Sequence, residues 1–326
     1  MKRTLLVIAC CIPLLLSALH SSDARVKILA LDGGGVRGVA TLTLLSRLEQ
    51  ETGCNFHDDF EVFAGTSTGS MIAVMLALGV SVDNLLIDYE TMAQNVFAHK
   101  GYGIFSPEYS PEPLKESIIH CLRRAGLDAD ATLGDVPKTI IIPAVQLCNP
   151  KTDTPSFYVF ENISAEGKAH KIVDVLLSAT AAPTYFPAHN GKVDGGTGMN
   201  DPSLVAFTFA LKAKGGGIDD YLLFSLGTGY IKDGIHGQAD WGIVEWLDHE
   251  ALLSLLFDLN DQIPSVILSR ILGDSYKRFN FPLEHSYALD DYKAIPSLIK
   301  ETTHEIITVM HEKWTGTCDW IAANAA

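Results

Sequence analysis

Apolar and polar positions along the first hundred residues predict short buried strands, each followed by a helix. Residues 26–31 form a largely apolar run that ends at a glycine cluster, as a central parallel strand does. Residues 39–51 place leucines on one side of a helix that ends before Gly53. A second strand at 60–64 leads into an almost wholly apolar helix at 70–80, which must be buried and is expected to pack across the sheet.

The same alternation continues along the chain. Further apolar runs predict strands at residues 139–147, 156–160 and 221–226. Helical patterns occur at 81–97 and 171–181, whereas residues 98–115 have no clear period and predict a surface loop. Strands that alternate with helices indicate an α/β fold, with a mixed, mostly parallel central sheet sandwiched by helices.

The tail from residue 239 onward is mainly helical by pattern. Glycine and proline are expected to interrupt it at Pro264, Gly273, Pro282 and Pro296. No linker-like stretch divides the chain. We therefore predict a single domain over residues 25–326, with its core at about 27–230 and a mainly helical C-terminal extension.

The first 24 residues are predicted to be a secretory signal peptide. Lys2 and Arg3 form a positive start, residues 5–19 are mostly apolar, and residues 20–24 turn polar. The alternative is an uncleaved N-terminal anchor, for which the apolar stretch is short. Export would make the protein secreted or associated with the cell envelope. Peripheral contact with a membrane is compatible with both locations.

Composition narrows the range of partners. The chain has 24 basic and 39 acidic residues and a formal net charge of −15, which argues against nucleic acid, because a phosphate backbone demands a basic surface. No C-x-x-C or H-E-x-x-H spacing occurs, so we expect no metal site and no cofactor. After export four cysteines would remain, and we expect free thiols, with one or two disulfides as the alternative. They are Cys54, Cys121, Cys148 and Cys318.

The candidate nucleophile lies in the second of two glycine-bracketed segments. Residues 65–69 read Gly-Thr-Ser-Thr-Gly, which is a G-x-S-x-G pattern between a predicted strand and a predicted helix. In such a nucleophile elbow a tight turn exposes the serine hydroxyl, and the crowded backbone favours glycine at both flanking positions. Ser67 is therefore the candidate nucleophile of an acyl hydrolase.

The first glycine-rich segment, residues 32–38, is the candidate oxyanion hole. Unhindered backbone N–H groups can converge there on a developing negative charge, and the N–H of the residue after the serine can join them. These candidate donors are Gly33, Gly34, Gly35 and Thr68. Arg37 would steady the loop or attract an anionic head group, with a surface salt bridge as the alternative. A phosphate-binding loop is disfavoured because no G-K-[ST] follows and the G-x-G-x-x-G spacing is imperfect.

The general base is harder to assign from sequence. Six histidines follow the candidate nucleophile, at His189, His236, His249, His285, His304 and His311. None of them lies in a glycine-flanked loop after a strand, whereas Asp194 does, because Gly195 and Gly196 follow it. A carboxylate that acts directly as base must be within hydrogen-bond reach of the hydroxyl and partly shielded from water. A hairpin turn is the alternative explanation of the Asp-Gly pair.

These motifs together resemble the patatin-like phospholipase family. They occur in the family's order and approximate spacing, at residues 32–38, 65–69 and 194–196. The stretch 178–189 looks like the plant patatins in particular, and residues 223–229 are similar to the family's late core strand and glycine turn. The resemblance extends over about residues 27–230.

The resemblance implies a Ser-Asp dyad without a catalytic histidine. It assigns Ser67 as nucleophile, Asp194 as base, residues 33–35 as the oxyanion hole and Arg37 as the family's arginine. It also implies a metal-independent lipid acyl hydrolase that acts on phospholipids, galactolipids and related esters at a membrane surface. Residues 197–199 differ in detail from the plant proteins, which leaves the exact substrate open.

Two other functions remain open at this point. One is a Ser-His-Asp esterase, in which Asp194 or another acid orients one of the downstream histidines. The other is a storage or host-interaction protein that keeps the scaffold without catalysis.

Overall fold

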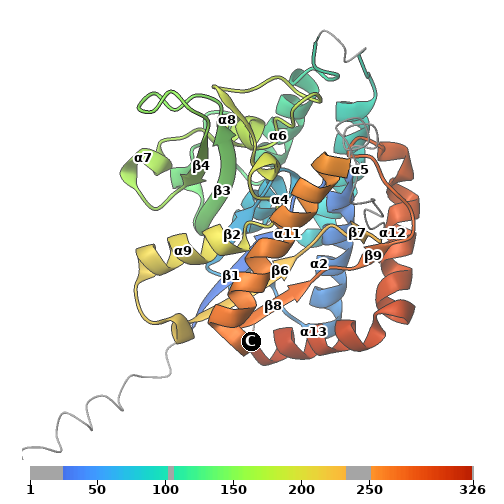
Figure 1. The fold of residues 1–326 in the computed structure, drawn as a ribbon. Helices are drawn as coiled ribbons and strands as arrows, with labels where there is room; N and C mark the ends of the chain where they lie inside the picture. The colour runs from blue at the N-terminus through green and yellow to red at the C-terminus, as the bar shows by residue number, and fades with distance from the viewer. Residues whose placement is uncertain (1–24, 102–105, 233–250, 325–326) are drawn as a thin grey trace, which may run out of the picture.

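The computed structural model describes residues 25–101, 106–232 and 251–324, and the predicted signal peptide lies outside these ranges. Seven strands form one sheet in the order β4-β3-β2-β1-β6-β8, with β5 paired to β3 (Figure 1). The strands are β1 (Val26–Leu31), β2 (Val62–Gly65), β3 (Thr139–Gln146), β4 (Ser156–Glu161), β5 (Lys192–Asp194), β6 (Tyr221–Leu226) and β8 (Tyr276–Phe279). A small second sheet pairs β7 (Tyr230–Ile231) with β9 (Pro282–Leu283).

The sheet is mixed and mostly parallel. Strands β3, β2, β1, β6 and β8 run parallel to one another, whereas β4 and β5 run antiparallel to β3. All six residues of β6 are buried, as expected for a parallel strand that is covered on both faces. Leu31 at the end of β1 pairs with Gly65 of β2 and with Leu226 of β6, so the three central strands end at the same level.

Helices cover both faces of the sheet, so the α/β fold class is confirmed. Because successive side chains of a strand point to opposite faces, Leu29 belongs to one apolar cluster and Ile28 to the other. The larger cluster is closed by α2 (Gly38–Thr52), α4 (Thr68–Ala77), α5 (Val82–Phe97), α6 (Glu112–Arg124), α8 (Ile172–Ala179), α12 (Ile295–His304) and α13 (His311–Asn324). The smaller cluster is closed by α9 (Ser203–Lys214) and α11 (Ala251–Leu272).

Helix α4 packs against β1, β2 and β3, as its apolar composition predicts. Every residue of α4 except Met71 is buried. The segment predicted as a loop up to residue 115 differs, because α6 already begins at Glu112. Helices α6 and α9 were not predicted, because neither directly follows an apolar strand-like run that ends in a glycine motif.

Where the structure describes it, the tail is mainly helical, but the interruption predicted at Pro264 is wrong. Pro264 lies inside α11, which continues to Leu272 while it packs on α9. Pro296 lies in the first turn of α12, where a proline loses no helical hydrogen bond. Gly273 follows the end of α11, and Pro282 lies in strand β9 between α11 and α12, so the interruptions predicted at these two positions are confirmed.

Strand β8 was missed because its sequence carries no apolar run. It reads Tyr-Lys-Arg-Phe, and only its two end residues are buried. It pairs with β6 at the edge of the sheet, where a strand has one neighbouring strand instead of two. The C-terminal part of the chain therefore completes the central sheet.

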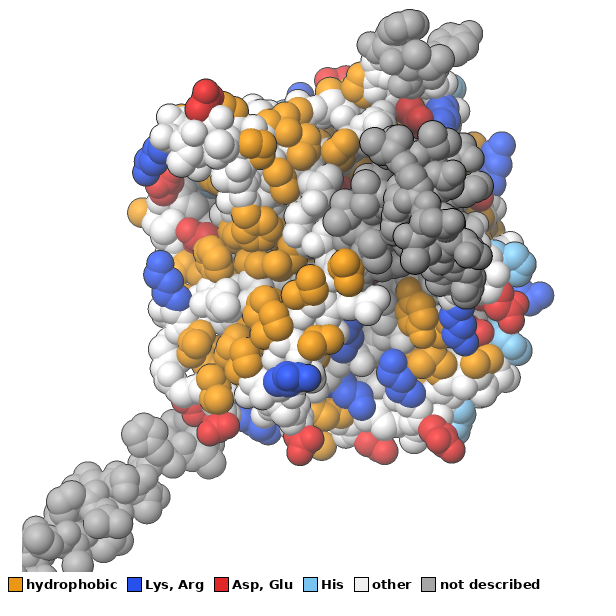
Figure 2. All heavy atoms as spheres, in the orientation of Figure 1, with side chains coloured by type: hydrophobic (Ala, Val, Ile, Leu, Met, Phe, Trp, Pro, Cys, Tyr) orange, Lys and Arg blue, Asp and Glu red, His pale blue; other side chains and the backbone are white. Residues whose placement is uncertain are grey.

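The cysteines that the structure describes are free thiols, as expected: Cys54, Cys121, Cys148 and Cys318. Among the described helices, none combines the length and the apolar character that a membrane crossing needs. Helix α11 nevertheless exposes several aliphatic side chains, which Figure 2 shows as a row across the face of the molecule.

Candidate active site

The candidate site lies at the carboxyl ends of the three central strands. Because β1, β2 and β6 end level with one another, the glycine segments that follow them meet at one edge of the sheet. These segments are residues 32–38, 65–69 and 227–229. Ligands of parallel α/β sheets bind at this edge, where loops and helix N-termini converge.

Ser67 occupies a strained turn between β2 and α4. Its φ of 51° and ψ of −123° lie outside the ordinary regions for a residue with a side chain. A Cβ atom on Gly65 would lie 2.0 Å from the carbonyl oxygen of Gly69, and one on Gly69 would lie 2.3 Å from that of Leu31. Both flanking positions therefore require glycine, as the elbow motif predicts.

Asp194 makes direct contact with this serine. The Oγ atom of Ser67 donates a hydrogen bond to Oδ2 of Asp194 at 2.5 Å, across 127 residues of sequence. Strand β5 holds the carboxylate in place through the pairing of Asp194 with Ala144 of β3. The N–H of Gly196 donates to the other carboxylate oxygen at 2.7 Å. The structure thus brings together the two residues that sequence reasoning selected.

Burial shifts the pKa of this carboxylate. Asp194 is 4% exposed, and loss of hydration raises its pKa to about 6, against the hydrogen bonds from Ser67 and Gly196, which lower it. A carboxylate with this pKa is ionised at neutral pH. It also holds a proton more readily than an exposed aspartate does, as a general base needs.

The described histidines bind elsewhere. His189 pairs with Asp174 at 2.8 Å, and the ring of His285 lies 3.3 Å from Glu301. Among residues 25–101, 106–232 and 251–324, no histidine is hydrogen-bonded to Ser67. His236 and His249 lie outside the described residues.

Of the four predicted oxyanion donors, Gly33 differs from the others. Its N–H already donates to the carbonyl oxygen of Asn200 at 3.3 Å. The N–H groups of Gly34, Gly35 and Thr68 have no hydrogen-bond acceptor within the part of the chain that the structure describes. Thr68 begins α4, so its N–H is one of the orphan donors at the positive end of that helix.

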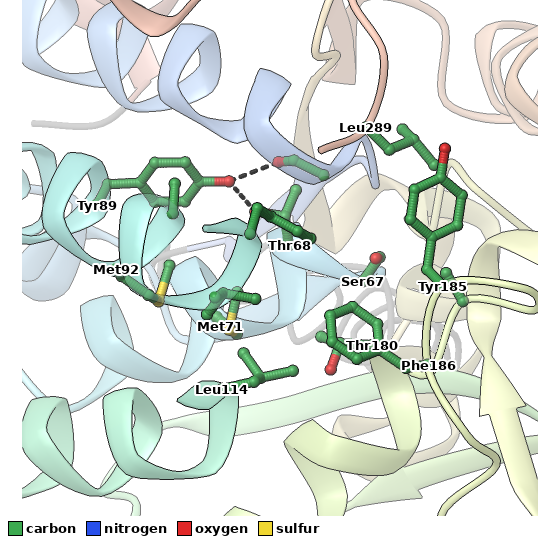
Figure 3. Close-up of a pocket in the computed structure, with 15 residues that line it drawn as sticks. Ser67, Thr68, Met71, Tyr89, Met92, Leu114, Thr180, Tyr185, Phe186 and Leu289 are labelled. Atoms are coloured by element: carbon green, nitrogen blue, oxygen red, sulfur yellow. Dashed lines mark hydrogen bonds between the residues drawn. The ribbon is translucent and has the colours of Figure 1, made fainter. Parts of the chain in front are cut away.

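A tyrosine ties the two glycine segments together. The hydroxyl of Tyr89 on α5 donates to the carbonyl oxygen of Gly35 and shares a hydrogen bond with the hydroxyl of Thr68 (Figure 3). Burial raises the pKa of Tyr89, so its hydroxyl stays protonated. The side chain of Thr228 donates to the carbonyl oxygen of Gly33 at 2.9 Å. The carbonyls of this loop are therefore fixed, and its free N–H groups keep one orientation.

Arg37 binds backbone carbonyls of the same loop region. Its Nη1 lies 3.3 Å from the carbonyl oxygen of Gly229, and its Nε lies 3.5 Å from that of Gly34. These contacts agree with the loop-stabilising role that was one of its predicted alternatives.

A buried ion pair anchors the start of the first glycine-rich segment, residues 32–38. Arg278 of β8 donates to both carboxylate oxygens of Asp32, at 2.6 and 3.0 Å, and lies 3.2 Å from Asp201. Asp32 is 1% exposed and Asp201 is fully buried. Removing one partner of such a buried pair costs about 3–5 kcal/mol, because the remaining charge stays without a partner.

An apolar cavity opens beside Ser67. It has an empty volume of about 560 Å³, part of which is open to solvent. Ser67 lies at its wall, between Thr68 and Tyr185 in Figure 3. Apart from the serine and two threonines, the lining is glycine or apolar and aromatic: Gly35, Met71, Tyr89, Met92, Ala93, Val96, Phe97, Leu114, Ala182, Tyr185, Phe186 and Leu289.

Comparison with known proteins identifies the family to which this chain belongs. The model of the patatin-like phospholipase family matches residues 29–207, more than half of the chain. The chain belongs to the patatin-like phospholipase family. The predicted resemblance is thereby confirmed.

Its relatives include bacterial and plant proteins. A cGAMP-activated phospholipase of Escherichia coli (strain TW11681) is 30% identical over 203 residues, which cover 56% of this chain and 54% of that protein. Patatin-like protein 1 of Oryza sativa subsp. indica is 29% identical over 71% of this chain and 66% of its own length. The chain thus spans about half to two thirds of these relatives. Among solved structures, VipD from Legionella pneumophila matches 85% of this chain and 67% of its own, with 14% identity and a TM-score of 0.40.

Sequence reasoning missed two residues of this patatin-like site. Arg278 lies in an unpredicted strand, 246 residues from Asp32, and no motif surrounds it. Tyr89 lies on a predicted helix, but one tyrosine on an amphipathic helix carries no signal of a bond to another segment. Both were recognisable only once the fold had brought the segments together.

Proposed function

We propose that this patatin-like protein is a serine acyl hydrolase that cleaves carboxylic ester bonds of membrane lipids through a Ser67–Asp194 dyad. One observation carries the proposal. The hydroxyl of Ser67, on a strained elbow, donates a 2.5 Å hydrogen bond to the buried carboxylate of Asp194. The apolar cavity beside it supplies a place for an acyl chain.

The first half of the reaction forms an acyl-enzyme. Oγ of Ser67 attacks the ester carbonyl carbon while Asp194 takes the hydroxyl proton. The carbonyl oxygen becomes an oxyanion, which the N–H groups of Gly34, Gly35 and Thr68 stabilise. Collapse of this intermediate breaks the ester bond, and Asp194 returns its proton to the departing alcohol oxygen.

The second half restores the enzyme. Asp194 accepts a proton from a water molecule, whose oxygen attacks the acyl carbon bound to Ser67. The same donors stabilise the second oxyanion. The fatty acid then leaves, and the serine oxygen recovers a proton from Asp194. No step needs a metal ion or a cofactor.

The substrate class follows from the cavity and the outer surface. An almost wholly apolar lining suits a hydrocarbon chain better than a polar acyl group. Exposed apolar patches are typical of surfaces that contact membranes or partners. Such side chains follow the outer face of α11 (Figure 2), namely Leu259, Ile263, Val266, Ile267 and Ile271. We therefore propose a phospholipid or galactolipid at a membrane surface as substrate, and a secreted or cell-envelope location in keeping with residues 1–24.

Hydrolysis of a short p-nitrophenyl ester and of vesicles containing mixed phospholipids and galactolipids tests this function. Wild-type protein should release nitrophenol and free fatty acid, and Ser67→Ala should release neither. Replacement of each downstream histidine by alanine separates the dyad from a Ser-His-Asp enzyme. If one histidine variant is as inactive as Ser67→Ala, the dyad assignment is wrong. A wild-type protein without activity on any of these esters would favour the non-catalytic alternative.

A further inference from the structure

A second apolar cavity lies directly behind the one that contains Ser67. It has an empty volume of about 400 Å³, part of which is open to solvent. Three of its lining residues, Met71, Tyr89 and Met92, also line the first cavity. The two spaces are therefore separated by a wall only one side chain thick.

On the basis of the proposed acyl hydrolase function, we infer that Met71 and Met92 form a gate that sets the acyl-chain length of the substrate. An acyl chain that ends within the first cavity leaves this gate closed. A longer chain reaches the second cavity only when the two methionine side chains move aside.

The position of the wall suits this role. Met71 follows Ser67 by four residues, one turn along α4, and is the one residue of that helix that is not buried. Met92 follows Tyr89 by one turn of α5. Figure 3 shows both methionines on the side of the cavity away from Tyr185, with Ser67 between. A chain attached to Ser67 that extends away from Tyr185 therefore meets the methionines.

The three wall residues differ in their freedom to move. The Tyr89 hydroxyl is held by Gly35 and Thr68, so its ring stays in place. A methionine side chain is unbranched, has three rotatable bonds and adapts to the shape of its neighbours. Neither Met71 nor Met92 has a polar group that would be left without a partner when it rotates. The movable part of the wall is thus the methionine pair.

The second cavity is suited to the end of a hydrocarbon chain. Apart from Asp88, Tyr89 and Cys121 its lining is aliphatic: Leu42, Met71, Ile72, Met75, Leu85, Met92, Ile118 and Leu176. The Asp88 carboxylate is ion-paired with Arg124, and only the apolar part of this side chain faces the cavity.

The test compares chain-length preference before and after the gate is removed. We would measure kcat/KM on p-nitrophenyl esters from butanoate to hexadecanoate, in one detergent, for wild type, Met71→Ala, Met92→Ala and the double variant. The ratio of kcat/KM for hexadecanoate to kcat/KM for octanoate should rise by about tenfold in the double variant. This is the lower end of the discrimination that one methylene group gives in an apolar pocket. Met310→Ala, which removes a methionine outside both cavities, is the matched control.

A blocking variant tests where the extra chain goes. Leu85 lines the second cavity but not the first. Adding Leu85→Phe to the double variant should therefore remove its increased kcat/KM for hexadecanoate. Thermal unfolding of each variant verifies that it is folded. An unchanged chain-length ratio in folded Met71→Ala and Met92→Ala proteins would overturn the gate, and so would an equal change in Met310→Ala.

A binding measurement keeps the gate separate from the proposed catalysis. In a Ser67→Ala background, displacement of a fluorescent fatty acid reports the affinity for octanoate and hexadecanoate without turnover. Removing both methionines should raise the preference for hexadecanoate about tenfold here as well. If the wild-type protein hydrolyses no ester but this preference rises, the catalytic proposal fails and the gate stands. If the esters are hydrolysed but neither preference changes, the gate fails alone.

Discussion

The catalytic edge and the apolar cavity adjoin each other but are built in different ways. At the edge, hydrogen bonds and ion pairs fix each polar group: Ser67 to Asp194, Tyr89 to the oxyanion loop, and Arg278 to Asp32. In the cavity wall, the side chains of Met71 and Met92 carry no charged group and no hydrogen-bond donor. Proton transfer tolerates little displacement, whereas a hydrocarbon site gains from side chains that adapt. Changes at the edge should therefore alter rate and stability, and changes in the wall should alter selectivity.

The largest effect is expected from Asp194→Asn. The amide cannot accept the serine proton, and loss of a well-placed base typically costs about 10²–10⁴ in rate. The fold should persist, because asparagine has nearly the same shape and can still accept the bond from Gly196. Steady-state kinetics on a short ester, with circular dichroism as the folding control, provide the measurement. A turnover near that of wild type would show that Asp194 is not the base.

Arg278→Met should have the largest effect on stability. It leaves the carboxylates of Asp32 and Asp201 buried without a cation, which should lower the free energy of unfolding by about 3–5 kcal/mol. Urea unfolding measures the change. Arg123→Ala on the exposed face of α6 is the control, with an expected change within about 0.5 kcal/mol. Equal values for the two variants would mean that the buried cluster does not anchor the loop.

Prediction of these two regions from sequence succeeded to different degrees. The elbow at Ser67 and the Asp-Gly-Gly turn at Asp194 are local, since each needs glycine beside a strand, and that requirement is visible in the sequence. Arg278 belongs to an edge strand without an apolar run, so neither the strand nor the ion pair has a local signal. The wall of Met71 and Met92 is likewise invisible, because a methionine on an apolar helix face reads as ordinary core.

The pH dependence of the reaction should follow Asp194. Its pKa of about 6 means that the base is protonated, and so inactive, below that pH. The kcat/KM on a neutral ester should fall about tenfold per pH unit below 6 and level off above it. The side chain of Asn200 donates a hydrogen bond to Asp261, and burial raises the pKa of Asp261 to about 6 as well. Asp261→Asn is therefore the control. If that substitution abolishes the pH dependence, Asp194 is not the titrating group.

Tyr89→Phe should have a smaller effect than these changes. It removes the hydroxyl that holds Gly35 and Thr68 while the ring stays in the cavity wall. Loss of one such hydrogen bond is worth about 1 kcal/mol, or roughly a fivefold fall in kcat. The chain-length preference should stay as in wild type, because the methionines are unchanged. A shifted preference with normal kcat would place Tyr89 in the gate instead of the catalytic support.

Reaction with an alkyl fluorophosphonate, followed by peptide mass spectrometry, tests the dyad most directly. The reagent bonds to a serine only when its hydroxyl is activated. We expect one adduct, on Ser67, that forms at least about a hundred times faster in wild type than in Asp194→Asn. An adduct on another residue, or equal rates in the two proteins, would contradict the assignment of Ser67 and Asp194 as the catalytic pair.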